Sequence, residues 1–267
     1  PVIRKQFPSL PVAIRMHNRE TQYYEELAAA ASNPVLKFFF RLESYKFSVY
    51  EPAILKAADV VFCISPEETA WVKQFQPLAF WIPAFSPFFP PKQTVSKVSD
   101  PIKAILIANF SVKENQNAAE WMLQEIIPRQ DARILWTFAG KNPVWKSNDR
   151  VQIIANPKEL QPMIEAQDLM VIPVFQQSGT KLKLLEAIAS GKPFFTTPAA
   201  WKGSGMDFPK ICFQNQQEFS DLLTALQSGA LDSVYPEITS CYQSLYDPAK
   251  NVQQMLSLLT QIKRPVI

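Results

Sequence analysis

Residues 169–198 constrain the fold more than any other part of the chain. They begin with an apolar run at 169–175, which is followed by a polar turn. Apolar side chains then recur at the spacing of one helical face: Leu182, Leu185, Ile188 and Ala189. Gly191 is placed to cap this helix, and Pro193 prevents its continuation, so residues 194–197 must begin a new strand. The order strand, helix, strand predicts a parallel pair with a right-handed crossover.

The start of this helix is suited to binding a phosphate. Ser178, Gly179 and Thr180 leave backbone N–H groups without intrahelical partners at the positive end of the helix dipole. Gly179 lacks a side chain that would keep a phosphate from the backbone, and Lys181 and Lys183 add positive charge. The helix dipole disfavours basic residues at this end, so the two lysines are better explained if an anion binds between them.

Glu186 follows Lys183 by three positions and therefore lies on the same helical face. A lysine near the helix tip and a carboxylate one turn deeper suit a sugar diphosphate, the lysine for the phosphate and the glutamate for the ribose hydroxyls. An ordinary solvated helix start, with its usual lysine and glutamate residues, is the alternative that spacing alone leaves open.

The residues themselves favour the first interpretation. Residues 178–193 read SGTKLKLLEAIASGKP, and Thr-Thr-Pro and a glycine-containing turn follow. This segment resembles the donor-binding segment of family 4 glycosyltransferases of the GT-B fold. The resemblance implies an α/β protein with two Rossmann-like domains and a retaining, metal-independent activity. It also implies a nucleotide sugar of the UDP or GDP type as substrate, with no cofactor.

A second segment points to the same family. Residues 14–24, IRMHNRETQYY, resemble the R-x-H-N-x-E signature in the N-terminal domain of these enzymes, although Glu20 follows directly after Arg19. The resemblance places His17 at the cleft as the catalytic histidine, close to the donor sugar. A structural histidine at a strand end is the alternative.

The chain also departs from the family pattern. After a strand at 102–107, relatives carry a Gly-Arg pair and a lysine that reach the diphosphate; here Asn109 and Lys113 are the candidates. The first of the family's two glutamates is replaced by Ser178, so the identity of the sugar is not implied. Asn156 and Leu160, which belong to the loop that lines the base pocket in relatives, complete the expected donor site.

Composition excludes several other functions. A net charge of +3 over 267 residues gives no argument for nucleic acid as a partner. The single histidine excludes a multi-histidine metal site. Three widely spaced cysteines predict free, buried thiols in a reducing compartment such as the cytoplasm. The helix expected at 35–58 is rich in aromatic and basic residues, for which we prefer core packing; the alternative is a peripheral contact at the inner face of the membrane.

The pattern predicts two similar α/β domains that face a cleft. Residues 1–95 are the end of an N-terminal domain, together with a linker at 82–100 that is rich in Pro and Ser. Residues 96–250 form the nucleotide-sugar domain, and residues 251–267 are a helix that packs back on the first domain. Because Pro1 is no initiator and no Gly-rich strand turn precedes the first strand, we expect that N-terminal residues are missing. Further predicted elements are helices at 21–31, 118–127, 158–166, 217–226 and 249–262, and a loop at 199–205 that is either mobile or an ordinary surface loop.

The predicted reaction is the transfer of a sugar to the hydroxyl of a glycan or lipid-linked acceptor, in glycan or polysaccharide biosynthesis. Two alternatives remain. A nucleotide-sugar epimerase of the same fold would need acid and base carboxylates in the cleft. A non-catalytic GT-B scaffold would explain the missing Arg and the Ser in place of Glu.

Overall fold

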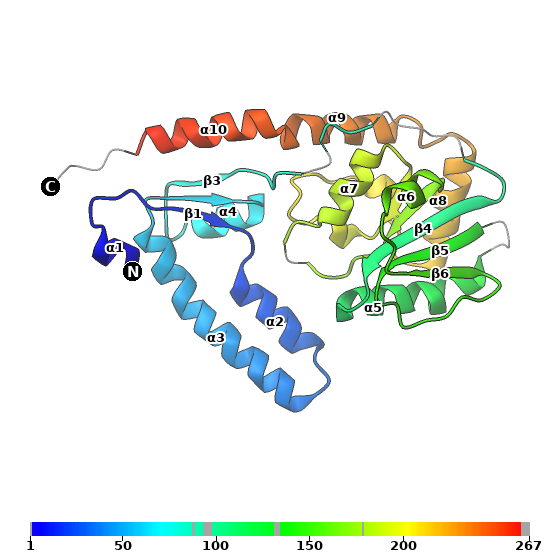
Figure 1. Ribbon diagram of the computed structural model, residues 1–267, viewed down its shortest axis with the longest axis horizontal. Coiled ribbons are helices and arrows are strands. Elements are labelled where there is room, and N and C mark those ends of the chain that lie inside the picture. Colours follow the sequence, from blue (N-terminus) through cyan, green and yellow to red (C-terminus); the bar gives the residue numbers. More distant parts are fainter. Residues whose placement is uncertain (1, 87–88, 93–97, 131–133, 178, 263–267) are drawn as a thin grey trace.

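The computed structural model describes residues 2–86, 89–92, 98–130, 134–177 and 179–262, which form two parallel sheets (Figure 1). The first sheet has the order β1-β2-β3 and the second the order β6-β5-β4-β7-β8. Helices cover both sheets, and every strand pair within them is parallel. The expected α/β fold with two Rossmann-like domains is confirmed.

The second sheet reverses its direction of winding next to its central strand. From β4 the chain moves outward to β5 and β6, and it then returns to the opposite side of β4 at β7. In such open sheets ligands bind at the carboxyl ends of the strands, at the point of reversal. The bounds are β4 Ile102–Asn109, β5 Ile134–Lys141, β6 Val151–Ala155, β7 Leu169–Ile172 and β8 Phe194–Thr196.

The helices of this domain bury apolar faces against the sheet. Gly191 ends α7 in a left-handed conformation, with φ at 71°, and β8 pairs in parallel with β7, as the local pattern predicts. The bounds are α5 Lys113–Trp121, continued by a π-helical turn Met122–Ile126 and a 3-10 turn Ile127–Arg129, α6 Gln161–Glu165, α7 Leu182–Ser190, α8 Gln216–Gln227 and α9 Val234–Tyr246.

In the first domain both faces of the central strand are covered. Val61 and Cys63 of β2 face a cluster with Leu55 and Val72, because successive strand residues point to opposite sides. The other two residues of β2 pack against Met255, Leu258 and Leu259 of α10, which crosses back from the second domain (Figure 1). The bounds are α1 Val2–Gln6, β1 Ala13–Met16, α2 Glu20–Ala30, α3 Pro34–Ala57, β2 Val60–Cys63, α4 Pro66–Val72, β3 Ala79–Trp81 and α10 Pro248–Thr260.

Helices α2 and α3 form a hairpin that extends away from the first sheet (Figure 1). At the base of this hairpin, Glu51 of α3 connects the two helices through hydrogen bonds. The Glu51 carboxylate accepts hydrogen bonds from the backbone N–H of Glu20 (2.7 Å) and of Thr21 (3.3 Å), and from the Thr21 hydroxyl (2.5 Å). It thus supplies acceptors to backbone donors at the start of α2, where Arg19 makes no side-chain cap.

The preference for core packing along α3 is wrong for much of that helix. Of its side chains, the buried ones are Ser44, Glu51 and Leu55, whereas Phe38 and Tyr45 are 70% and 69% exposed. The physical reason is that α2 covers only one side of α3. The opposite side, here called the outer face of α3, is a stripe of exposed apolar residues: Val35, Phe38, Leu42, Tyr45 and Val49.

Two more elements differ from the sequence predictions. The segment 199–205, expected to be a surface loop, contains a 3-10 turn in which Trp201 is buried between Phe194 and Phe208. Helix α9 was not predicted, and its Tyr242 and Tyr246 are fully buried and stacked at 5.1 Å between ring centroids. In the described ranges, no helix has both the length and the apolar character needed to cross a bilayer.

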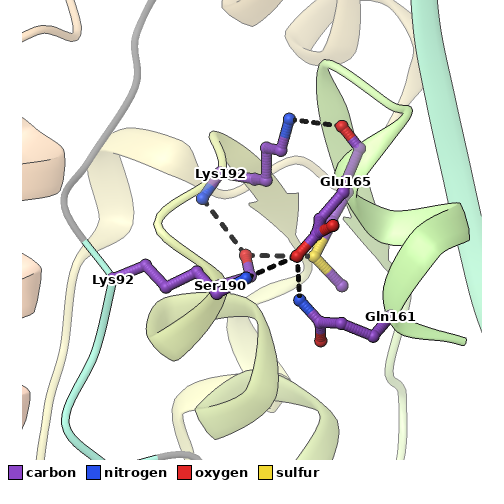
Figure 2. Close-up of polar contacts among 6 residues, drawn as sticks. Lys92, Gln161, Glu165, Ser190 and Lys192 are labelled. Atoms are coloured by element: carbon purple, nitrogen blue, oxygen red, sulfur yellow. Dashed lines mark hydrogen bonds and ion pairs between the residues drawn. The ribbon is translucent and has the colours of Figure 1, made fainter.

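The linker is tied to the second domain by a polar cluster (Figure 2). The backbone N–H of Lys92 donates to the Ala189 carbonyl at 2.9 Å, and its ammonium pairs with the Glu165 carboxylate at 2.6 Å. Gln161 donates to the same carboxylate at 3.0 Å, and Lys192 donates to the Glu165 carbonyl at 2.9 Å. Hydrogen bonds from Gln161 and Lys92 lower the pKa of Glu165. This cluster fixes the linker against α6 and the end of α7.

Candidate functional site

A cavity of about 330 Å³ opens at the carboxyl edge of the second sheet. Its walls come from the ends of β4 and β5, from α5 and α7, and from the loop before α6. Four residues predicted for the site, which are far apart in the sequence, therefore line one cavity: Asn109, Leu160, Lys183 and Glu186. The cavity lies where the winding of the sheet reverses, which is the usual place for a ligand in an open parallel sheet.

Lys183 supplies a positive charge to this cavity, and hydrogen bonds fix the position of its ammonium group. Its ammonium donates to Asn115 Oδ1 at 2.9 Å, and Asn115 Nδ2 donates to the Asn109 carbonyl at 2.9 Å. Burial, together with the neighbouring charge of Lys181, lowers the pKa of Lys183 to about 8. Because the Lys183 ammonium is half-buried and its hydrogen-bond acceptor is a neutral amide, a bound anion stabilises its charged form.

Glu186 lies one turn deeper on the same face of α7. Burial raises the pKa of its carboxyl group above the ordinary value. Glu186 also borders a smaller cavity of about 220 Å³ with Lys92 and Ser190. Its carboxylate is therefore available to hydroxyl groups of a ligand that lies along α7 from Lys183.

The loop before α7 differs from the prediction. The helix begins at Leu182 with Lys181 as its N-cap residue, so Gly179 and Thr180 belong to the loop and not to the first turn. The Thr180 hydroxyl donates to the Gly203 carbonyl at 2.8 Å, and the Lys181 ammonium donates to the Gly179 carbonyl at 2.7 Å. Burial lowers the pKa of Lys181 to about 8, although Glu26 and Glu68 act in the opposite direction. Ser178 lies outside the described residues.

Six described residues of the predicted site do not line this cavity: Gly179, Thr180 and Lys181 of the loop before α7, and Asn156, Lys113 and His17. Asn156 has φ at 49°, and its side chain accepts from the backbone N–H of Asn142 at 3.1 Å. Lys113 is the exposed first residue of α5. His17 directly follows β1 and is exposed, whereas its neighbour Asn18 lines a second cavity, between the domains.

Asn115 is a site residue that the sequence reasoning missed. The sequence pattern predicts that helix α5 starts at Ala118. The helix begins at Lys113 instead, so Asn115 lies in its first turn and reaches Lys183. The three asparagines at 109, 115 and 117 were the available signal.

The predicted free thiols are found. Cys63, Cys212 and Cys241 are free, and Cys63 is buried. Burial raises the pKa of Cys63 and Cys212 to about 11, so neither is a reactive thiolate at neutral pH. No group of three or more His, Cys, Asp or Glu side chains that could hold a metal ion occurs within the residues that the structure describes.

Known proteins share this architecture. Residues 102–226 match the family model Glycosyl transferases group 1. A mutant of S. aureus TarM, in complex with Fondaparinux, alpha-GlcNAc-glycerol and UDP, superposes with a TM-score of 0.61 at 13% identity, over 92% of this chain and 50% of that chain. Anabaena Alr3699/HepE in complex with UDP and glucose gives a TM-score of 0.59 at 12% identity, over 94% of this chain and 72% of that chain. The chain has the GT-B fold.

The GT-B chain also has a curated relative of similar sequence. It is 22% identical over 208 residues to an uncharacterized 44.6 kDa protein in the cps region of Klebsiella pneumoniae, covering 72% of this chain and 53% of the relative. The chain thus spans about half the length of the curated relative that it matches.

Proposed function

We propose that this GT-B chain belongs to a retaining, metal-independent glycosyltransferase. It would transfer a sugar from a nucleotide diphosphate donor to a hydroxyl of a glycan or lipid-linked acceptor, in glycan or polysaccharide biosynthesis. The observation that carries the proposal is the cavity in which Lys183 and Glu186 lie along one face of α7 at the carboxyl edge of the sheet. The match to Glycosyl transferases group 1 and the UDP in the TarM and HepE complexes support it.

Three residues of this cavity, Lys183, Asn115 and Glu186, have roles in the proposed reaction. As the bond between sugar and phosphate breaks, negative charge develops on the leaving diphosphate, and Lys183 stabilises that charge. Asn115 holds the Lys183 ammonium in place, and Glu186 accepts hydrogen bonds from the ribose hydroxyls. The sugar passes through an oxocarbenium-like state, which requires little covalent chemistry from the protein. Lys181 adds positive charge at the start of α7.

Calorimetric titration with UDP and GDP tests the proposal. Replacing Lys183→Ala or Glu186→Gln removes a hydrogen bond that involves a charged group, so we expect affinity to fall by about 10- to 100-fold. Lys146→Ala and Glu237→Gln, at exposed positions that line none of the cavities described above, serve as matched controls. Equal affinities for the parent chain and both site variants would show that the site is assigned wrongly.

Product analysis separates transfer from the two alternatives. An epimerase converts the nucleotide sugar in the absence of an acceptor, whereas a transferase forms a glycoside only when an acceptor is present. A scaffold would give neither product with any donor of a nucleotide-sugar panel.

We also propose that the outer face of α3 contacts the anionic inner surface of a membrane. Its exposed apolar stripe is accompanied by Lys37, Arg41 and Lys46, against one acidic residue, Glu43, in residues 34–50. Aromatic and apolar side chains that enter the headgroup region, with basic residues at its surface, are typical of interfacial helices. The hairpin extends away from the sheet, so this face is accessible to a planar surface (Figure 1).

Sedimentation with vesicles tests this contact. The chain should bind vesicles that contain phosphatidylglycerol more strongly than pure phosphatidylcholine, and the variant Phe38→Ser should reduce that binding. Phe7→Ser, at another exposed phenylalanine, should leave it unchanged. Equal vesicle binding by the Phe38 variant and the parent would contradict the proposal, as would a dimer of the parent that Phe38→Ser abolishes.

A further inference from the structure

Lys141 is the last residue of β5 and lines the same cavity as Lys183 and Glu186, but the proposed reaction gives it no role. Its side chain is exposed, and no described residue accepts a hydrogen bond from its ammonium group. Among the described residues of the cavity wall, Lys141 and Lys183 are the cationic ones and Glu186 is the acidic one. The position of Lys141 therefore decides which part of a bound nucleotide meets this second positive charge.

Hydrogen bonds on both sides of Lys141 place it beside the loop that leads into α6. The backbone N–H of Asn156 donates to the Gly140 carbonyl at 2.7 Å, and the backbone N–H of Asn142 donates to Asn156 Oδ1 at 3.1 Å. Both chain neighbours of Lys141 are thus bonded to Asn156. Pro157 follows Asn156 and lines the cavity together with Lys141.

This loop lies at the end of the cavity away from the proposed diphosphate position. At the other end, the Lys183 ammonium is bonded to Asn115 of α5. Glu186 follows one turn deeper along α7, and it borders the smaller cavity together with Gln161, the first residue of α6. A nucleotide whose diphosphate contacts Lys183 and whose ribose contacts Glu186 therefore places its base at the loop before α6, next to Lys141.

The surroundings of Lys141 determine which bases can bind there. Pro157 and Leu160 offer apolar side chains to a planar ring, whereas the Lys141 ammonium offers hydrogen-bond donors and no acceptor. Uracil carries a carbonyl oxygen at C4 and guanine carries one at C6, and both accept from an ammonium group. Cytosine and adenine carry an amino group at these positions, which is itself a donor and cannot accept from Lys141.

We propose that Lys141 selects the nucleotide of the donor: its ammonium group donates to the ring carbonyl of uracil or guanine, so cytidine and adenosine diphosphate sugars are excluded. This role rests on the proposed glycosyl transfer, because that proposal supplies the positions of the diphosphate and the ribose. Lys141 determines specificity and takes no part in catalysis, since it lies at the base and not at the bond that breaks.

UDP and CDP are the sharpest probes of this role, because uracil has a carbonyl at C4 where cytosine has an amino group. Calorimetric titration of the parent chain should show about 10-fold tighter binding of UDP than of CDP. GDP and ADP differ in the same way at C6, and the pair that binds the parent more tightly is used for the variants.

Three variants separate a contact with the base from a general effect of charge. Lys141→Met removes the ammonium group and should reduce the preference for the carbonyl base to about 1, mainly by weakening UDP. Lys141→Arg keeps a cationic donor and should retain the preference. Lys158→Met is the matched control, because Lys158 is exposed, follows Pro157 directly and lines none of the cavities described above. It removes the same charge and should leave the preference unchanged.

Equal affinities of the parent for UDP and CDP would overturn the role of Lys141, as would a preference for UDP that persists in Lys141→Met. If Lys141→Met weakens both nucleotides by the same factor, the ammonium contacts the phosphates that they share, and base selection is refuted. In each of these cases the transferase proposal still stands on UDP binding and its loss in Lys183→Ala. If no nucleotide binds the parent, the transferase proposal fails, and the role of Lys141 fails with it. Because Lys141 is exposed, the variants should keep the melting temperature of the parent, which is measured without ligand.

Discussion

Binding of UDP at pH 8 should be accompanied by proton uptake. Burial lowers the pKa of Lys183 to about 8, so in the free protein this amine is about half protonated at pH 8. A diphosphate beside Lys183 favours the ammonium form and raises its pKa again. Binding should therefore take up about half a proton at Lys183, and up to about one proton if Lys181, whose pKa is also about 8, responds in the same way.

The lowered pKa of Lys183 also determines how the stability of the fold depends on pH. In the unfolded chain the lysine has its ordinary pKa of 10.5, so between pH 8 and 10.5 the unfolded state binds more protons than the folded one. The free energy of unfolding should therefore rise with pH in that range, by about 3 kcal/mol at most for Lys183. The phosphate groups of UDP are already deprotonated at pH 8, because their last pKa is about 6, so they do not contribute to the proton uptake measured on binding.

Calorimetry in two buffers measures the uptake directly. Titrations at pH 8 in Tris and in HEPES, which have different ionisation enthalpies, should give binding enthalpies that differ in proportion to the protons taken up. Lys183→Met should remove about half a proton of this uptake, whereas Lys146→Met, at an exposed lysine, should not. Measurable UDP binding with the same enthalpy in both buffers would refute the placement of the diphosphate against Lys183.

Two further predictions concern the framework of the site. Glu51→Ala removes the acceptor of the hydrogen bonds from Glu20 and Thr21, so it should lower the free energy of unfolding in urea by about 2 to 4 kcal/mol. Glu43→Ala on the same helix, whose partner Lys46 is exposed, should change it by less than about 1 kcal/mol; equal effects of the two variants would contradict the capping role of Glu51. Tyr242→Phe removes the hydrogen bond from the Tyr242 hydroxyl to Ser86 Oγ at 2.8 Å and should lower stability by about 1 kcal/mol. Tyr50→Phe, at an exposed tyrosine, should have almost no effect, and a comparable loss there would show that the buried hydrogen bond is not the cause.

The elements that the sequence predicted best are those whose signals are local. Gly191 and Pro193 fix the end of α7 because they act on the backbone of their own turn, and Lys183 and Glu186 share a face because a helix repeats at that spacing. The linker at 82–100 was predicted in the same way, because its prolines interrupt helices and strands. Helix α9 was missed because three of its five buried residues are tyrosines, which carry a polar hydroxyl and do not stand out as a core pattern.

The contacts between distant segments could not be obtained in this way. Nothing near Asn115 in the sequence indicates that it meets Lys183, and nothing near Phe38 indicates that no described segment covers its side of α3. Whether a residue is buried depends on which distant segment of the chain packs against it, and amino-acid composition does not indicate that.

The sequence by itself therefore determined the parallel α/β plan and the helix that carries the donor-site candidates, because backbone preferences depend on neighbouring residues. Only the tertiary structure decided that Asn115 holds Lys183, and that Asn18, Arg19 and Glu68 line one cavity. These residues lie on separate elements, namely α5, α7, α4 and the loop after β1, and the packing of these elements sets the distances between them.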